Sequence, residues 1–191
     1  DAEKVKQCLS DVIATGKFQV PHYSFTLGRP DGEERRYEIG KDDMVIVEGI
    51  HGLNPVFTRE LPEGSCVKLY VSVKQQIKDA NGEVMSPMDL RLIRRIVRDI
   101  QFRDTEPEHT ISMWPEVVEG ENKYIRPYRI SADYTVNSIH IYEPCVLRTV
   151  VIPLLRQIAA DSPYYRKARD LESRLMRFEP IDPALVPEHS M

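Results

Sequence analysis

The chain has 191 residues, of which 41% are hydrophobic and 29% are charged. These values are typical of one globular domain and exclude disorder and collagen, and no apolar run approaches the roughly 18 residues that a membrane span needs. The 26 basic and 30 acidic residues give a net charge of -4, which argues against a broad grip on nucleic acid. Three cysteines without a paired spacing favour a reducing cytoplasm over a disulfide framework or a zinc site.

The first third of the chain alternates helical, turn and strand-like patterns. Apolar residues at helical spacing predict an amphipathic helix over 2–14, and residues 18–25 are predicted to be extended. A polar stretch over 28–38 contains Pro30-Asp31-Gly32 and predicts an exposed hairpin or loop. The unbroken apolar run over 44–47 is typical of a strand buried on both faces of a parallel sheet.

The rest of the chain adds strands and longer helices. Strands are expected at 67–73 and 132–137, with an Asn-Gly turn signal at 81–82 between them. The helical patterns cover residues 88–102, 107–118, 144–160 and 163–178, with a possible kink at Pro153. Short strands separated by helices predict an α/β fold with a parallel sheet flanked by helices.

The helix expected over 88–102 carries four arginines at i, i+3, i+4 and i+7, namely Arg91, Arg94, Arg95 and Arg98. This spacing places the four guanidiniums on one helix face, where they repel one another unless anions lie near them. Guanidinium groups match phosphate oxygens well, so one interpretation is a phosphate site. The alternative is that Asp89, Asp99 and other carboxylates neutralise a solvated face.

Four further residues are candidates for a site. Glu48 follows the strand expected at 44–47, where a carboxylate can hold magnesium beside a phosphoryl group or simply cap a strand end. Tyr23 and Phe25 are two residues apart, so on a strand they would share a face and could stack on a flat base or fill a core. His51 lies in a glycine-rich loop, where histidines more commonly have no special role.

Two segments in sequence order, Val45-Ile-Val-Glu-Gly-Ile-His-Gly-Leu53 and Asp89-Leu-Arg-Leu-Ile-Arg-Arg-Ile-Val-Arg-Asp99, resemble the phosphoribulokinase/uridine kinase family of P-loop kinases. Pro21-His-Tyr-Ser-Phe25 is similar to the P-x-Y-D-F segment of that family, with Ser24 in place of Asp. Residues 123–128 and 132–138 resemble its segment and strand after the lid. Within the family, the chain resembles bacterial nucleoside kinases with a threonyl-tRNA synthetase-like N-terminal extension.

The resemblance implies a partial P-loop NTPase-like α/β fold with an arginine-rich lid helix, and a phosphotransferase that uses ATP and Mg²⁺. It implies that Glu48 helps to organise magnesium and phosphates, and that Tyr23 and Phe25 line the nucleoside pocket, with His51 and Arg91 as further candidates for substrate binding. It also implies phosphate contacts by arginines of the helix and lid, from which we select Arg94, Arg95, Arg98 and Arg103. Among these, we single out Arg94 and Arg98, together with Glu48, as candidate catalytic residues.

The G-x-x-x-x-G-K-[ST] motif of this family is absent from the 191 residues, because Gly16-Lys17 and Gly40-Lys41 lack the rest of the pattern. We therefore expect residues 1–191 to be the C-terminal part of a nucleoside kinase domain, with its lid at about 88–120, and to be inactive alone. The expected partners are ATP and a nucleoside such as uridine, with a homo-oligomer as a possibility. The alternatives are another acceptor, such as a phosphorylated sugar or pantothenate, and a non-catalytic module that binds an anionic ligand or a partner.

Overall fold

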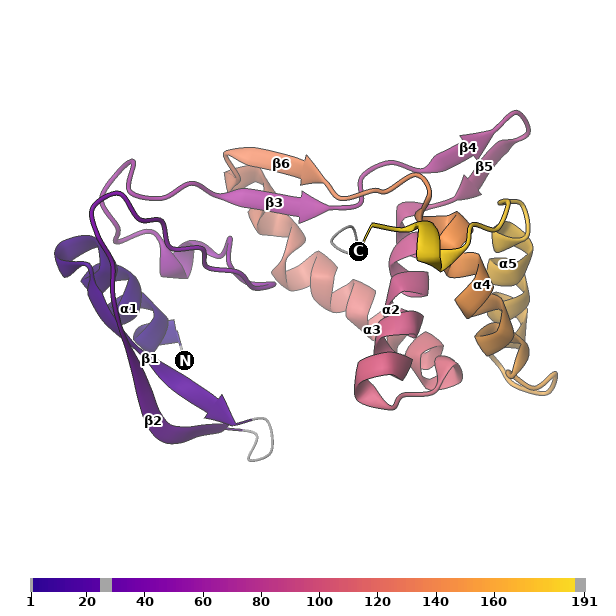
Figure 1. Ribbon diagram of the computed structural model, residues 1–191, viewed down its shortest axis with the longest axis horizontal. Coiled ribbons are helices and arrows are strands. Elements are labelled where there is room, and N and C mark those ends of the chain that lie inside the picture. Colours follow the sequence, from indigo (N-terminus) through magenta and orange to yellow (C-terminus); the bar gives the residue numbers. More distant parts are fainter. Residues whose placement is uncertain (1, 25–28, 188–191) are drawn as a thin grey trace. The chain divides into compact units, whose positions relative to one another are not determined.

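The computed structural model describes residues 2–24 and 29–187, and these contain five α-helices and six strands (Figure 1). Contacts divide the chain into two compact units, one of Asp1–Tyr70 with Asn122–Tyr134 and the other of Val71–Glu121 with Thr135–Met191. Among the described residues the strands form three two-stranded sheets, which are β1-β2, β3-β6 and β4-β5.

The first unit begins with helix α1 (Ala2–Thr15), close to the predicted bounds. The helix ends at Gly16, whose N–H donates to Val12 O at 3.0 Å and whose φ of 69° suits glycine best. The Gly16 carbonyl then accepts a hydrogen bond from Ile39 N at 2.9 Å, at the far end of the following hairpin. No residue of α1 is fully buried, so this helix covers the hairpin without forming a dense core.

Strands β1 (Lys17–Ser24) and β2 (Arg29–Glu38) form an antiparallel hairpin. The pairing runs in register from Lys17 opposite Glu38 to Pro21 opposite Glu34, and the register then shifts before Tyr23, which lies opposite Pro30. Proline cannot donate a ladder hydrogen bond, which is one reason for an irregularity beside Pro21. The predicted hairpin or loop at 28–38 is therefore the second arm of this hairpin, and Phe25 lies outside the described residues.

The strand predicted at 44–47 is wrong. These residues have no regular secondary structure, and the side chains of Met44 and Ile46 are 86% and 83% exposed. A continuous apolar run becomes a buried strand only when neighbouring strands satisfy its backbone and other elements cover both faces. Among the described residues, none of the three sheets supplies such a neighbour to this segment.

The parallel pairing that the sequence predicts occurs between β3 (Leu69–Ser72) and β6 (Tyr134–Asn137). Lys68 O accepts from Tyr134 N at 3.2 Å, and Ser72 O accepts from Ser138 N at 3.0 Å, so both strands advance in the same direction. Beyond the carboxyl end of β3, Val73 enters the hydrophobic core, and Ile139 after β6 packs against it. This parallel pair and its helices confirm the α/β class and are consistent with a P-loop kinase-like fold.

Helix α2 (Pro87–Arg103) is the central helix of the second unit, and its predicted range is confirmed to within one residue at each end. Ser86 caps its first turn by accepting from Asp89 N at 3.0 Å, while the Ser86 hydroxyl donates to the Asp89 carboxylate at 2.7 Å. Pro87 follows the cap, where its missing N–H costs nothing. Asp104 ends the helix in the left-handed region, at a φ of 50°.

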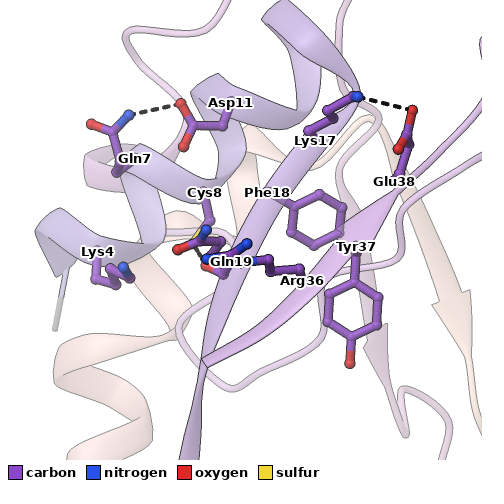
Figure 2. Close-up of a pocket in the computed structure, with 10 residues that line it drawn as sticks. All are labelled: Lys4, Gln7, Cys8, Asp11, Lys17, Phe18, Gln19, Arg36, Tyr37 and Glu38. Carbon is purple, nitrogen blue, oxygen red and sulfur yellow. Dashed lines mark hydrogen bonds and ion pairs between the residues drawn. The ribbon is translucent and has the colours of Figure 1, made fainter. Parts of the chain in front are cut away.

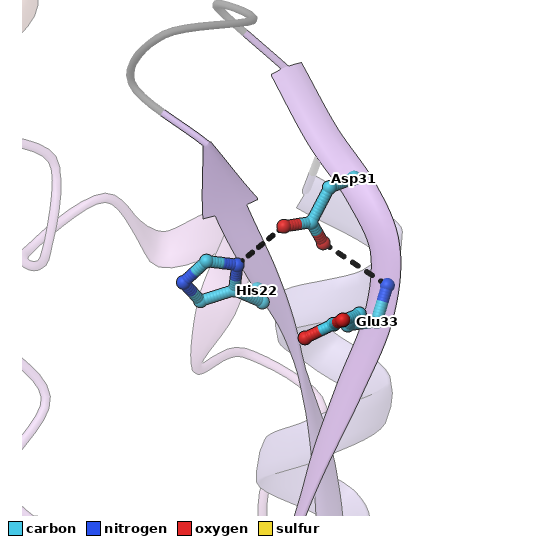
Figure 3. A group of neighbouring side chains, drawn as sticks. All are labelled: His22, Asp31 and Glu33. Carbon is cyan, nitrogen blue, oxygen red and sulfur yellow. Dashed lines mark hydrogen bonds and ion pairs between the residues drawn. The ribbon is translucent and has the colours of Figure 1, made fainter.

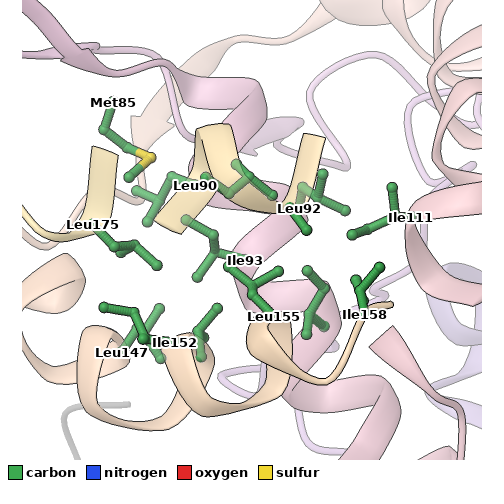
Figure 4. Close-up of a cluster of buried hydrophobic side chains, with 14 of the residues drawn as sticks. Met85, Leu90, Leu92, Ile93, Ile111, Leu147, Ile152, Leu155, Ile158 and Leu175 are labelled. Atoms are coloured by element: carbon green, nitrogen blue, oxygen red, sulfur yellow. The ribbon is translucent and has the colours of Figure 1, made fainter. Parts of the chain in front are cut away.

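The core of the second unit forms where α2 packs on α4 (Glu143–Arg156) and α4 packs on α5 (Tyr165–Leu175) (Figure 4). The fully buried apolar side chains of α2 are Leu90, Leu92, Ile93 and Ile96. Helix α3 (Pro107–Tyr124) adds Ile111 to the same cluster. The side of α2 that faces away from the arginines is therefore a core face.

Strands β4 (Ile77–Asp79) and β5 (Gly82–Met85) form the hairpin that the Asn-Gly signal predicts. Gly82 has a φ of 112°, a conformation that side chains rarely adopt, and Asn81 N donates to the Asp79 carboxylate at 2.7 Å. The β4-β5 hairpin contacts α5 and closes one end of the core through the buried Met85.

Helix α4 continues through Pro153 for a further three residues.

A pair of matched substitutions tests the contrast between the two apolar segments. Ile96→Ala should lower the free energy of unfolding by about 2–5 kcal/mol, because it leaves a cavity in the core. Ile46→Ala should change it by less than about 0.5 kcal/mol, because that side chain is already in water. Urea unfolding followed by circular dichroism measures both free energies. A loss above about 2 kcal/mol for Ile46→Ala would indicate that residues 44–47 form a buried strand after all.

A second prediction concerns Asp89, at the start of α2. Burial alone would raise the pKa of Asp89, but hydrogen bonds from Lys167 and Ser86 and the charges of Lys167 and Arg174 outweigh it and hold this pKa below its usual value. The ionised carboxylate therefore stabilises the fold above the pKa of the unfolded chain, and this contribution disappears as the pH falls through the folded pKa. Asp89→Asn should cost about 1–3 kcal/mol at pH 7.

The pH dependence provides the check on this prediction. Thermal unfolding of the wild type and of Asp89→Asn should differ most at neutral pH, and the two curves should converge in acid. A difference that stays constant down to the most acidic pH at which the protein folds would show that the carboxylate charge contributes nothing.

Candidate functional site

The arginines of α2 share one face, as predicted, and all four contact carboxylates. Their partners are Glu121 on α3, Glu143 at the start of α4, and Asp99 on α2 itself. The first two partners are 30 and 49 residues away along the chain, so no local spacing pointed to them. The arginine face is therefore neither bare nor simply solvated, and it meets buried acids from three helices.

Arg94 makes the most complete of these contacts. Its Nε and one terminal nitrogen donate to the two oxygens of Glu143, each at 2.5 Å, and the same terminal nitrogen donates to Ser138 O at 2.8 Å. The Glu143 side chain is 6% exposed. Paired hydrogen bonds between a guanidinium and a carboxylate are among the strongest polar contacts in proteins, and they fix both groups. Arg94 thus connects α2 to α4 and to the end of β6.

Arg91 connects α2 to α3. Its Nη1 atom donates to the buried Glu121 carboxylate at 2.5 Å, and its guanidinium carbon lies 5.9 Å from the centre of the Trp114 ring. The ring face attracts the cation, so both contacts keep the guanidinium against α3. Arg91 and Arg94 therefore each have a buried acidic partner.

Asp99 gathers the remaining arginines. Its carboxylate lies 3.0 Å from Arg95, 3.4 Å from Arg98 and 3.1 Å from Arg103, and its side chain is 1% exposed. Arg98 and Arg103 are 49% and 51% exposed, so each also faces water. Three guanidiniums around one carboxylate leave two positive charges in excess. An excess of this kind is what an anionic ligand needs, and it is concentrated in the last two turns of α2.

The candidates from the first part of the chain lie in the first unit. Glu48 and His51 are exposed, in a segment of irregular backbone and turns, and the His51 carbonyl accepts from Asn54 N at 2.9 Å. Tyr23 lies on β1, just after the register shift, and is 47% exposed. An oxygen ligand such as the Glu48 carboxylate suits Mg²⁺, so the chemistry of this side chain fits the ion that the family implies. The roles of these residues stay predictions.

The hairpin also brings His22, Asp31 and Glu33 together, a group that sequence reasoning missed (Figure 3). Their potential ligand atoms all lie within 4.8 Å of one another. However, His22 Nδ1 and Asp31 Oδ2 are 2.5 Å apart, closer than the roughly 3.3 Å between two ligands of one tetrahedral zinc ion. Hydrogen bonds from His22 and from Glu33 N hold the pKa of Asp31 below its usual value. The group is therefore a set of hydrogen bonds to the Asp31 carboxylate across the hairpin.

A cavity of about 500 Å³ lies between α1 and the hairpin of β1 and β2 (Figure 2). Its polar side chains largely bond to one another, with Lys17 at 3.2 Å from Glu38 and Gln7 donating to Asp11 at 2.7 Å. Phe18 and Tyr37 stack beside it, with ring centres 5.3 Å apart. These two contacts occupy four of the polar side chains that line the cavity.

None of the helices in the described part of the chain combines the length and the apolar character that crossing a membrane requires. The cytoplasmic location, the homo-oligomer and the assignment of the whole chain to one kinase domain stay predictions.

Comparison with known proteins identifies the family. A sequence model described as the Phosphoribulokinase / Uridine kinase family matches residues 1–143. A uridine kinase of Macrococcus caseolyticus is 32% identical over 137 residues, which cover 71% of this chain and 58% of that protein. Uridine kinases of Staphylococcus haemolyticus and Ureaplasma parvum are 30% and 28% identical, over 71% and 70% of this chain and 58% and 56% of their own lengths. The chain belongs to the phosphoribulokinase/uridine kinase family, as the resemblance predicted.

The chain spans less than three fifths of the length of these curated relatives. The matched region includes the whole of α2 and its three acidic partners. The arginine face and the acids that hold it therefore belong to the part of the chain that the family shares.

Two arginine substitutions test whether Arg94 is held in place by its buried partner while Arg98 makes only a weak, half-exposed contact. Arg94→Ala should destabilise the second unit by about 3 kcal/mol, the lower end for a broken buried ion pair, because Arg94 itself is partly exposed. Arg98→Ala should cost less than about 1 kcal/mol, because its contact is long and half exposed. Trp114, the one tryptophan of the chain, reports unfolding of this unit by fluorescence. Equal losses in the two variants would contradict this difference.

Proposed function

We propose that this chain is part of an ATP-dependent nucleoside kinase that transfers the γ-phosphoryl group to the 5′-hydroxyl of uridine or a related nucleoside. The family and the relatives named uridine kinase support a phosphotransferase. The observation that carries the proposal is the group of three guanidiniums around the buried Asp99, whose excess positive charge is suited to a polyphosphate. Phosphoryl transfer depends mainly on positioning and on stabilising negative charge, and arginines supply both.

The arginines divide by their contacts. Arg98 and Arg103 are half exposed around a shared acid, so we assign them to the phosphates of ATP, with Arg95 beside them. Arg91 and Arg94 would reach a phosphate only by leaving Glu121 and Glu143. We propose that these two arginines contribute to substrate binding and catalysis chiefly by fixing α2 against its neighbours.

The remaining roles rest on the first unit. We propose that Glu48 helps to hold Mg²⁺, which would neutralise phosphate charge when bound. We also propose that Tyr23 and Phe25 contact the nucleoside base and that His51 takes part in substrate binding. The exposed ring of Tyr23 is compatible with stacking on a base. Because the printed sequence lacks G-x-x-x-x-G-K-[ST], we further propose that the 191-residue chain does not catalyse the transfer on its own.

Activity assays test this proposal. A longer protein that contains these 191 residues together with a P-loop should phosphorylate uridine with ATP, and the 191-residue chain alone should not. Nucleosides, pantothenate and a phosphorylated sugar are assayed in parallel, because related kinases use different acceptors. Turnover of uridine by the 191-residue chain, or a preference of the longer protein for a non-nucleoside acceptor, would contradict the proposal.

A substitution in the longer protein tests the arginine assignment. Arg98→Ala should lower kcat/KM for ATP about tenfold or more, because a hydrogen bond between charged groups contributes roughly 1.5–3 kcal/mol. Arg156→Ala is the matched control, since Arg156, at the end of α4, is similarly exposed and pairs with Glu172 on α5. Unchanged kinetics in Arg98→Ala would make this arginine part of a solvated face.

A further inference from the structure

Asp99 occupies an unusual position on α2. It is almost completely buried, yet it lies on the border between the apolar core face and the arginine face. A buried carboxylate is costly unless charged partners and hydrogen bonds compensate it. Asp99 has three guanidiniums within 3.4 Å, and Thr110 on α3 donates a further, long hydrogen bond at 3.4 Å.

The backbone of the same residue ends the helix. The Asp99 carbonyl accepts from the N–H groups of Asp104 and Thr105, which form the corner between α2 and α3. Arg103 lies in the last turn before this corner, and Thr110 lies in the first turn after it. One residue therefore fixes both the end of the helix and the side chains that project from it.

The charge balance at Asp99 differs from that at the other two acids. Glu143 and Glu121 each hold one arginine of α2, whereas Asp99 holds three. The Asp99 carboxylate has two opposite effects on the binding of an anion. It keeps the guanidiniums in a fixed arrangement, and it also competes with the anion for them, because a carboxylate and a phosphate accept the same hydrogen bonds.

We infer that Asp99 is a positioning residue of the phosphate site, whose buried carboxylate orients Arg95, Arg98 and Arg103 and limits the strength with which they bind a polyphosphate. This inference rests on the proposed kinase function for its effect on turnover. Asp99 does not touch the reacting atoms. It acts through the three guanidiniums, so its removal should separate the affinity for the anion from the rate of transfer.

Asp99→Asn removes the charge with little change in shape. The site then carries three uncompensated positive charges, so it should bind tripolyphosphate at least threefold more tightly and show a lower KM for ATP. The guanidiniums lose their common anchor, so kcat should fall at least tenfold. A purely structural role would reduce the folded fraction, which lowers the apparent kcat but does not tighten anion binding.

The matched control is Asp89→Asn. Asp89 is a second buried aspartate on α2 with cationic partners, Lys167 and Arg174, away from the arginine face. Tripolyphosphate binding is measured by calorimetry and kinetics by ATP consumption. Both use a longer protein that contains these 191 residues together with a P-loop, at a temperature where circular dichroism shows every variant folded. Asp89→Asn should lose stability but keep the wild-type affinity for tripolyphosphate and the wild-type kcat.

The outcomes separate this inference from the proposed function. Tighter binding with slower turnover in Asp99→Asn alone supports it, and weaker or unchanged tripolyphosphate binding in that variant overturns it. If the wild type binds tripolyphosphate but phosphorylates no nucleoside, the proposed function fails, and the affinity of Asp99→Asn still decides the role of Asp99.

A second variant covers the case in which Asp99→Asn does not fold. Asp99→Glu keeps the charge but displaces it by one methylene group, so tripolyphosphate affinity should stay within twofold of wild type while kcat falls at least tenfold. An unchanged kcat in Asp99→Glu, or a failure of both variants to fold, would assign Asp99 to the stability of the helix corner alone and overturn the inference.

Discussion

Four arginines on one face of a helix repel one another, and in α2 buried carboxylates lie among them and offset this repulsion. Glu121, Glu143 and Asp99 supply this compensation from α3, α4 and α2 itself. The opposite face of the same helix fills the hydrophobic core of the second unit. The core of the second unit and the arginine face therefore depend on one helix. A substitution on either face of α2 should also affect the contacts of the other face.

The compensation is uneven along α2, and under the proposed function this unevenness divides the arginines into two groups. Arg94, in the middle of the helix, is held by both oxygens of Glu143 and by a backbone carbonyl. Arg98 and Arg103, toward the end, share one carboxylate and remain half exposed. An arginine that has a buried carboxylate to itself holds two helices together. Arginines that share one carboxylate keep positive charge available for a ligand. A kinase needs both, because phosphoryl transfer requires fixed cations that still accept the charge of the nucleotide.

The sequence predicted what local chemistry decides. The range of α2 and the Asn81-Gly82 turn each follow from neighbouring residues, and the parallel strands β3 and β6 follow from short apolar segments. The segment at 44–47 was wrong because a buried strand depends on neighbours that its own residues do not encode. The acids Glu121 and Glu143 were missed because their partners lie far away along the chain. The sequence predicted the arginine face. Only the structure showed which arginines have a buried acid of their own and which share Asp99.

The central claim, that the end of α2 and not its middle receives phosphate, has a direct test in the arginine side chains themselves. The Nε–H signals are recorded by NMR while tripolyphosphate is added to a ¹⁵N-labelled protein that contains these 191 residues together with a P-loop. The signals of Arg98 and Arg103 should shift, whereas the signal of Arg94 should not move because its guanidinium stays on Glu143. A shift of Arg94 as large as that of Arg98, or no shift in any arginine of α2, would contradict the central claim.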